Sequence, residues 1–461
     1  MKNLLKGRLF FLMVAILMLA LVVACSSDDA DSDDGATDDD SGTEDTSSDD
    51  DGSSEGDGGI SGDLEIQYFV GGYGDSWWKE VIADFQAEYP DVNIIEHAGP
   101  NINDEMRTRW VSEDPPDVVY IDGAGSSETQ MVEDGQLMNL SEWVEGVELE
   151  NGDKLVDSFI VEPGKFDGEI YSLPLVFDTW GTWYNKNLVG ENGSYDVPTD
   201  FESFMSSMQE IKDGEGIDPF VTTGQHPYYF LRGMLYPAFG AAGGDELLAD
   251  LITGQEGAWT SDVVLEIMQR VERMQTEGMI DSGVGALNHT QSQMNFLLGN
   301  NAFIPVGFWL PNEMANDTPE DFEFGFIPSP MQGEGEPYAV VPDLRPLAIA
   351  EQAENPEAAK AFVEFAFTRE YAMSFSEHTG AIMNITGVDL TENENVPGYL
   401  IDANAMINDP EQVQIYEKPH PMSSDLETPI SNSLISLMLG NITAEEFVEE
   451  AEAAAAEYRG E

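Results

Sequence analysis

The pattern of apolar and polar residues first becomes regular near residue 64. Residues 64–68 alternate between apolar and polar side chains, which predicts a strand with one buried face. Apolar residues then recur at helical spacing, and those that share one face are Trp77, Trp78, Val81, Ile82 and Phe85. We expect this helix to begin at Asp75 or Ser76 and to end at Pro90.

Two more strands are expected after this helix. Val92–Ile95 is the first, and Asp117–Asp122 is the second, with an apolar centre typical of a strand that is buried on both faces. A strand, a helix and a strand at this spacing predict an α/β fold with a mostly parallel sheet.

Capping residues mark the starts of later helices. Thr199–Glu202 and Thr443–Glu446 each fit the capping-box pattern. Asn355 followed by Pro356 predicts an N-cap and a proline in the first turn. No low-complexity linker follows residue 62, so two lobes would be joined by short crossings.

The composition excludes some classes of protein. The chain has 461 residues, with 18 Lys and Arg against 89 Asp and Glu, and a formal net charge of −71. We expect no nucleic-acid partner, because phosphate binding depends on Lys and Arg. The hydrophobic share of 41% is enough to fill a core, and the single cysteine excludes a disulfide within the chain.

The acidic residues are unevenly placed. Residues 28–57 hold 15 acidic residues and no basic residue, and residues 1–25 hold three basic residues. Setting both aside leaves 74 acidic residues against 15 basic residues, a net charge of −59. Such a surface repels itself in dilute buffer and is screened at high salt. We therefore expect a halophilic acidic protein.

The first 24 residues have the pattern of a secretory signal peptide. Basic residues precede an apolar run of 16 residues, Leu9–Ala24, which is shorter than the ~20 that span a bilayer. The run ends in Val22-Val23-Ala24-Cys25, which resembles the lipobox of bacterial lipoproteins, where the cysteine carries the lipid. We expect residues 25–62 to be the lipidated Cys25 and an acidic disordered tether. The protein would be anchored at the extracellular or periplasmic face of the cell membrane.

Five short motifs follow the opening strand and helix in a fixed order. They are Glu88-Tyr89-Pro90-Asp91-Val92, Pro115-Pro116-Asp117-Val118-Val119, Leu137-Met138-Asn139-Leu140, Asp167-Gly168-Glu169-Ile170-Tyr171-Ser172-Leu173-Pro174 and Trp183-Tyr184-Asn185-Lys186-Asn187-Leu188. In this order they resemble the extracellular solute-binding proteins of ABC importers, in their carbohydrate-binding branch. The Gly71–Tyr73 loop and Trp309–Met314 are similar to the members that bind N-acetylglucosamine and chitobiose.

The resemblance implies a periplasmic-binding-protein-like α/β fold, with two lobes joined by a multi-segment hinge and the ligand cleft between them. The expected N-lobe is 63–175 with 340–385, and the expected C-lobe is 176–339 with 386–461. The resemblance also implies a receptor rather than an enzyme. It would close on a sugar or an oligosaccharide and deliver it to the permease subunits and their ATPase. We expect a monomer without a cofactor.

Two strand ends supply the first candidate ligand-binding residues. Ligands of open α/β sheets bind outside the carboxyl ends of the strands. This rule selects Gly72 and Tyr73 after the first strand and Asp122 after the third. A dinucleotide site is not expected, because Trp77 stands where the third glycine of G-x-G-x-x-G would fall.

An aromatic segment supplies further candidates. Sugars present apolar C–H faces rimmed by hydroxyls, so a sugar site pairs aromatic rings with polar groups. Residues 176–184 have this chemistry, and we expect them to form one strand with Asp178 and Trp180 on the face that lines the cleft. The remaining candidates are Gln225, Trp309, Asn312, Asp343 and Arg345. Arg345 has an alternative role, pairing with a nearby carboxylate.

Two alternatives stay open at this point, a secreted glycosidase and a solute-binding protein for a ligand other than a sugar. A glycosidase needs two placed carboxylates, but pairs carry no information among 74 acidic residues. The G-x-S-x-G match at Gly52–Gly56 has no predicted strand or helix beside it, so it does not indicate a hydrolase site. The acidic tract fits no calcium-loop pattern, and we expect no metal site.

Overall fold

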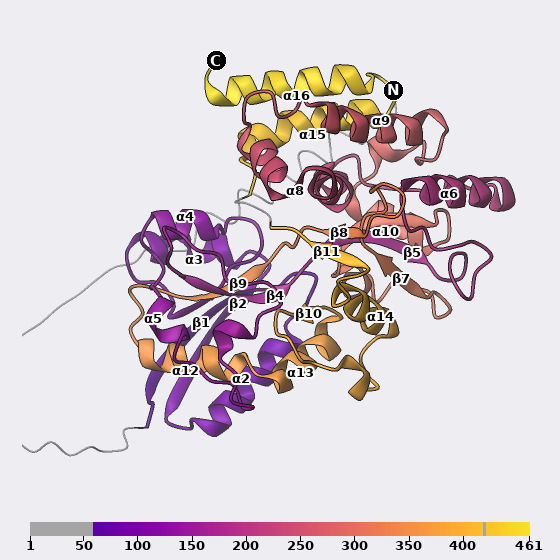
Figure 1. Ribbon diagram of the computed structural model, residues 1–461. Coiled ribbons are helices and arrows are strands. Elements are labelled where there is room, and N and C mark those ends of the chain that lie inside the picture. Colours follow the sequence, from indigo (N-terminus) through magenta and orange to yellow (C-terminus); the bar gives the residue numbers. More distant parts are fainter. Residues whose placement is uncertain (1–58, 418–420) are drawn as a thin grey trace, which may run out of the picture. The chain divides into compact units, whose positions relative to one another are not determined.

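The computed structural model describes residues 59–417 and 421–461 (Figure 1). The expected signal peptide, Cys25, the Gly52–Gly56 match and all but the end of the tether lie outside the described residues. Within the part that is described, no helix is both long and apolar enough to cross a membrane.

One sheet has six strands, in the order β10-β4-β9-β3-β1-β2. Its strands are β1 (Gly62–Phe69), β2 (Val92–Gly99), β3 (Val118–Tyr120), β4 (Ser172–Phe177), β9 (Arg345–Ile349) and β10 (Ile382–Met383). Strand β1 is parallel to β2 and β3, whereas β9 is antiparallel to β3 and β4, and β10 to β4. The prediction of a mostly parallel sheet is therefore wrong. The sheet is mixed because β9 enters between β3 and β4 from a distant part of the chain and runs against both.

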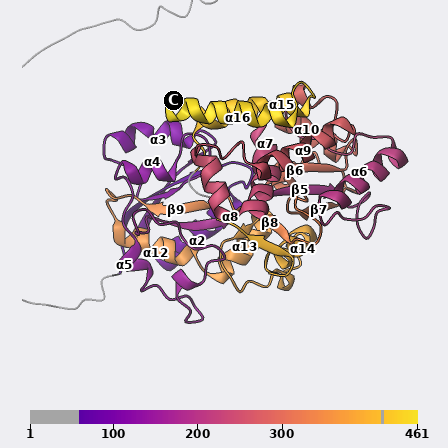
Figure 2. The same ribbon diagram turned by 45° about the horizontal axis from the view of Figure 1, so that its top comes forward.

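Helices cover both faces of this sheet, as Figures 1 and 2 show. One face carries α2 (Ser76–Glu88), α12 (Pro356–Ala366) and α13 (Arg369–Thr379), and the other carries α3 (Ile102–Val111) and α4 (Glu128–Glu133). Two short helices complete the region, α5 (Ser141–Val144) and η1 (Leu155–Asp157). The apolar face predicted for α2 is confirmed, since all five of its residues are buried.

A second, antiparallel sheet has three strands in the order β6-β5-β7. These are β5 (Trp180–Asn185), β6 (Phe303–Gly307) and β7 (Phe324–Ile327), and a separate parallel pair joins β8 (Tyr338–Val340) to β11 (Val413–Ile415). The other elements are α6 (Phe201–Glu215), α7 (Tyr228–Phe230), the π-helix η2 (Leu231–Leu235), α8 (Tyr236–Thr253), α9 (Asp262–Thr276), η3 (Val284–Ala286), α10 (His289–Leu297), α11 (Leu310–Glu313), η4 (Leu390–Glu392), α14 (Gly398–Ile407), α15 (Ser424–Met438) and α16 (Ala444–Arg459). The fold is thus of two α/β lobes, one around each main sheet.

Each sheet has its own aromatic core. Beside the six-stranded sheet, the buried side chains of Tyr68 and Trp78 stack with ring centroids 4.8 Å apart. Beside the three-stranded sheet, Phe204 and Phe303 pack edge to face with centroids 5.1 Å apart, and neither is exposed. Burial of such rings is the main favourable term that holds each sheet to its helices.

The segment 176–184 is not one strand, contrary to our expectation. Strand β4 ends at Phe177 and β5 begins at Trp180, in the other sheet, so Asp178 and Thr179 form a crossing between the two sheets. Both strands are buried on both faces. No glycine or proline marks the boundary, so the apolar pattern runs across it without a break.

A second crossing lies against the first. Residues 341–344 connect β8 to β9, and the backbone N–H of Asp343 donates to the carbonyl oxygen of Asp178 at 2.8 Å. Thr179 and Pro342 form an antiparallel bridge beside this bond. The two crossings are therefore hydrogen-bonded to each other where they enter the six-stranded sheet.

The cap predictions have mixed outcomes. Asn355 caps α12 with Pro356 in the first turn, and Thr443 forms a capping box with Glu446, as predicted. The box predicted at Thr199–Glu202 is wrong, because α6 is capped by Asp200, whose side chain accepts from the N–H of Ser203. Asp is as good an N-cap as Thr, and the Ser203 hydroxyl reaches back to the Asp200 backbone, which closes the box one residue later.

Candidate functional site

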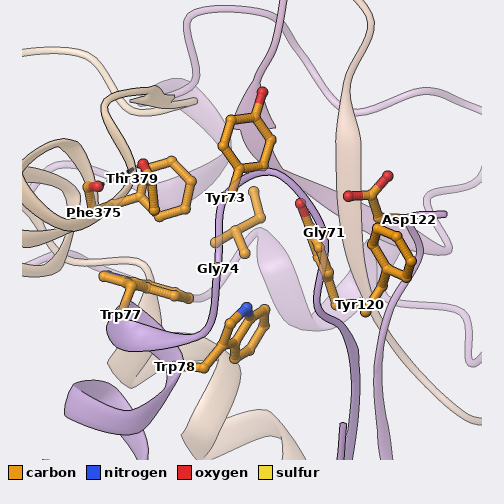
Figure 3. Close-up of a pocket in the computed structure, with 11 residues that line it drawn as sticks. Gly71, Tyr73, Gly74, Trp77, Trp78, Tyr120, Asp122, Phe375 and Thr379 are labelled. Carbon is orange, nitrogen blue, oxygen red and sulfur yellow. Dashed lines mark hydrogen bonds between the residues drawn. The ribbon is translucent and has the colours of Figure 1, made fainter. Parts of the chain in front are cut away.

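Two neighbouring strand ends form one side of the site. The Gly71–Gly74 loop follows β1 and Asp122 follows β3, and these parallel neighbours end at the same edge of the six-stranded sheet. A small cavity lies there, with Trp77 and Trp78 at one end and Tyr73 and Asp122 at the other (Figure 3). It has room for about one water molecule, so this cavity alone holds no larger ligand.

The glycine loop also contacts the other lobe. The side-chain amide of Asn312, in α11, donates a hydrogen bond to the carbonyl oxygen of Gly72. A Cβ atom on Gly72 would lie 2.8 Å from the Cβ of Trp309, which is closer than real Cβ contacts occur. Glycine at position 72 therefore allows Trp309 to lie directly against the loop after β1.

Aromatic rings gather around Trp180. The rings of Trp309 and Tyr229 pack edge-on against Trp180, with centroids 4.6 and 4.9 Å from it and nearly perpendicular planes. Tyr228 packs against the same tryptophan at 6.2 Å. Trp180 is almost completely buried, whereas Trp309 and Tyr228 are half-buried and have ring surface left for a ligand. We call these four residues the aromatic cluster.

A carboxylate cluster adjoins the aromatic cluster. The indole N–H of Trp180 donates to Asp343 at 3.0 Å, and Asp343 lies 3.1 Å from the guanidinium of Arg345. The same guanidinium contacts Asp122 at 2.9 Å and Asp178 at 3.3 Å. Arg345 thus forms ion pairs with all three carboxylates. We call Arg345 and the three aspartates the Arg345 cluster.

Burial raises the pKa values of two aspartates in this cluster. Loss of hydration raises the pKa of the Asp178 carboxyl to about 7, against the attraction of Arg345 and with the help of repulsion by Asp343. Burial likewise raises the pKa of Asp122, again opposed by Arg345. The hydroxyl of Tyr73 lies beside Asp178 but has no partner in hydrogen-bond geometry among the described residues.

The structure brings nine of the ten predicted ligand-binding residues into one region. They are Gly72, Tyr73, Asp122, Asp178, Trp180, Trp309, Asn312, Asp343 and Arg345. Gln225 is exposed, and its side chain donates to the backbone oxygen of Ala286 at 3.0 Å. Arg345 takes its alternative role, since its donors point at the three aspartates.

Sequence reasoning missed His289 and Gln293, which the structure places near the aromatic cluster. His226 and His289 lie with ring centroids 5.6 Å apart, and both rings pack near Tyr229. Gln293 donates to Glu313 at 2.9 Å, while its own side-chain oxygen is buried without a partner among the described residues. The aromatic run around His226 is visible in the sequence, but nothing there connects it to His289 on a different element.

The region offers two kinds of contact to a ligand. In the described ranges, no three His, Cys, Asp or Glu side chains are placed to hold a metal ion. Half-buried rings offer apolar surfaces, and the carboxylates and amides around them offer hydrogen bonds. The arrangement can hold a ligand that has both apolar faces and hydroxyl or amide groups.

The sequence is similar to that of known solute-binding proteins. Residues 71–373 match the profile of the family described as bacterial extracellular solute-binding protein, a range that contains every predicted ligand-binding residue. The chain is 26% identical to the diacetylchitobiose-binding protein NgcE of Streptomyces coelicolor over 324 residues, which cover 68% of each chain. It is 23% identical to the multiple sugar-binding protein of Streptococcus mutans, covering 70% of this chain and 75% of that one.

Solved structures have the same fold. A chitin oligosaccharide binding protein superposes with a TM-score of 0.66 and 19% identity, over 87% of this chain and all of the other. At this identity the likeness concerns the fold, and it agrees with the two-lobed architecture described above.

Proposed function

The chain belongs to the family of bacterial extracellular solute-binding proteins, and we propose that it is the sugar receptor of an ABC importer. It binds a sugar or an oligosaccharide between its two lobes and presents it to the permease subunits, which their ATPase drives. It performs no chemistry on the ligand.

The aromatic cluster is the observation that carries this proposal. Trp309 packs edge-on against Trp180 at 4.6 Å, so the ring faces are held at a fixed angle beside a carboxylate. Sugars stack their C–H faces on such rings and donate hydroxyl protons to carboxylates. Asp122 and Asp343 keep some side-chain exposure, at 17% and 13%, and are available as acceptors.

The relatives suggest the class of sugar. NgcE and DasA of Streptomyces coelicolor are named as diacetylchitobiose-binding proteins, and a structural neighbour as a chitin oligosaccharide binding protein. We therefore expect a short β-linked oligosaccharide of N-acetylglucosamine to be the first ligand to test.

Ligand capture proceeds by hinge closure. We assign residues 59–177 and 345–383 to one lobe, because the six-stranded sheet takes its strands from these ranges. The paired crossings at residues 178–179 and 341–344 form the hinge together with the segment after Met383, where the chain leaves this lobe again. Sugar held between the lobes stabilises the closed form, which docks on the permease.

The sequence before residue 59 supports attachment to the membrane. We infer that residues 1–24 are cleaved, that Cys25 carries the lipid, and that the acidic segment 26–62 holds the receptor, a monomer, at the outer face of the cell membrane. Metabolic labelling with a fatty acid should tag the wild-type protein and leave the Cys25→Ala variant unlabelled and released.

Calorimetric titration tests the function directly. The purified protein in 2 M NaCl is titrated with N,N′-diacetylchitobiose, raffinose and maltose, and the mixtures are analysed for hydrolysis. Binding of one sugar without cleavage is the expected result. Cleavage of a sugar would support a glycosidase instead, and absence of heat with every sugar would point to another kind of solute.

A further inference from the structure

The Arg345 cluster has more negative than positive charge. Three aspartates lie within 3.3 Å of one guanidinium, and the side chains of Arg345, Asp122 and Asp343 are no more than 17% exposed. Asp178 is not exposed at all. If all three carboxylates were ionised, the cluster would carry two uncompensated negative charges away from water, which is costly.

A proton on one carboxyl would relieve this cost, and Asp178 is the one of the three aspartates whose side chain has no exposure to water. Burial raises the pKa of Asp178 to about 7, against the attraction of Arg345. The pKa of Asp122 is raised in the same direction by burial.

Groups from both lobes face Asp178. From the six-stranded sheet and its loops come Tyr73, Tyr120, Asp122, Asp343 and Arg345. From the other lobe, the backbone N–H of Phe308, which follows β6, donates to the Asp178 carboxylate at 3.4 Å. Beyond these, Arg232 of the π-helix η2 attracts Asp343 and is itself paired with Glu427 at 2.8 Å.

The cluster also spans the hinge. Asp178 lies in the first crossing and Asp343 in the second, and their backbones are hydrogen-bonded at 2.8 Å. Asp122 follows β3, and Trp309, next to Phe308, lies against Gly72 of the β1 loop. A rotation of one lobe on the other therefore changes the surroundings of Asp178.

We propose that closure of the two lobes on the ligand is linked to the uptake of one proton by the Arg345 cluster, at Asp178. This inference rests on the proposed function, since it assigns a regulation to the same site. It makes the receptor sensitive to the acidity outside the cell, with capture favoured in mildly acidic surroundings.

Hydration of the Asp178 carboxyl explains why closure takes up a proton rather than releasing one. When α11 leaves the Gly72 loop, Phe308 and Tyr73 separate and water reaches the Asp178 carboxyl. Its pKa then returns toward the ordinary value for aspartate, near 3.8. The closed form holds the proton more tightly than the open form, so a rise in pH between these two pKa values favours the open form. Above the higher value both forms are ionised and the effect stops growing.

Proton uptake is measured on the purified protein in 2 M NaCl, with N,N′-diacetylchitobiose as the probe. Titrations at pH 5 to 8 in two buffers of different ionisation enthalpy count the protons taken up. One proton per ligand near pH 6 is expected, with Kd rising about tenfold per pH unit below pH 7 and levelling above it. Asp178→Asn, which cannot ionise, should bind without this dependence, whereas Asp104→Asn on the exposed surface of α3 should behave as the wild type.

Small-angle scattering of the ligand-free protein provides a readout that needs no sugar. The radius of gyration of the wild type should increase between pH 5 and pH 8, and that of Asp178→Asn should stay constant. Zero proton uptake by the wild type, or an equal pH response in Asp178→Asn, overturns the proposal while the receptor function stands. If no sugar binds at any pH, the proposed function fails, and scattering alone decides whether the lobes respond to protons. Should Asp178→Asn fail to fold, the wild-type proton count and scattering still give the answer.

Discussion

The side-chain amide of Asn312 bonds to the carbonyl oxygen of Gly72, 240 residues away in the sequence. This bond joins α11, beside the three-stranded sheet, to the loop that follows β1 of the six-stranded sheet. The neighbouring Trp309 lies so close to Gly72 that no Cβ atom fits between them. Contact between the lobes therefore depends on a residue without a side chain.

Gly72→Ala should weaken sugar binding by about tenfold or more. The added methyl group would lie 2.8 Å from the Cβ of Trp309, and the lobes must move apart to accommodate it. A shift of about 1.4 kcal/mol against the closed form corresponds to a tenfold loss. Calorimetry measures the change, and Gly164→Ala is the matched control because open space surrounds that position. Equal affinities of both variants and the wild type would contradict a closed form built on this contact.

Trp180→Phe should impair binding more than its effect on stability explains. Phenylalanine keeps a ring between Trp309 and Tyr229 but loses the indole N–H bond to Asp343. We expect Kd to rise at least tenfold, with a loss of about 1.5–3 kcal/mol in unfolding free energy from the hydrogen bond to a charged group. Trp259→Phe is the control, since that buried indole donates to Leu251 away from the site. It should lower the thermal midpoint but leave Kd unchanged; a similar Kd in both variants would exclude Trp180 from the site.

Arg345→Met should destabilise the protein by about 3–5 kcal/mol, because removing one partner leaves buried carboxylates without a counter-charge. The loss should shrink as the pH falls from 8 to 5, since the remaining aspartates can then take up protons. Urea unfolding at both pH values measures it. Arg107→Met removes an exposed ion pair with Asp104 and should have little effect. A loss that is the same at pH 5 and pH 8 would argue against protonation of the cluster.

Salt should stabilise the folded protein. The part of the chain beyond residue 57 has a net charge of −59, and its mutual repulsion is screened over about 10 Å at 0.1 M salt but about 3 Å at 1 M. The urea midpoint should rise steadily from 0.1 to 2 M NaCl, and equally in KCl, because screening depends on charge rather than on the cation. A urea midpoint that does not change with salt concentration would contradict the interpretation of the acidic surface as an adaptation to a saline habitat.

Local patterns in the sequence predicted local structure well. The apolar spacing of α2 and the caps at Asn355 and Thr443 depend on residues a few positions apart, and all three are confirmed. The box at Thr199 was displaced by one residue because Asp200 competes for the same role. The pattern of residues 176–184 predicts one strand, because no glycine or proline marks the crossing between the two buried strands.

The candidate site was predicted in part. Gly72, Tyr73 and Asp122 follow from the rule that ligands bind at strand ends, which depends only on recognising β1 and β3. The rule does not say what these residues contact. The sequence does not single out His289, because one histidine at the start of a helix has no distinctive pattern. Its place beside Tyr229 results from the packing of α7 and α10.

The sequence by itself determined the order of the elements, the acidic charge, the family to which the chain belongs and the residue types available for a sugar site. All of these are properties of short segments or of composition. Only the tertiary structure decided that Asp122, Asp178 and Asp343 share one arginine. Arg345 lies 167 positions from Asp178, and the pair forms because two crossings of the chain run side by side between the sheets. Burial at that meeting point raises the pKa of Asp178, and burial depends on every segment packed around it rather than on its own neighbours in the chain.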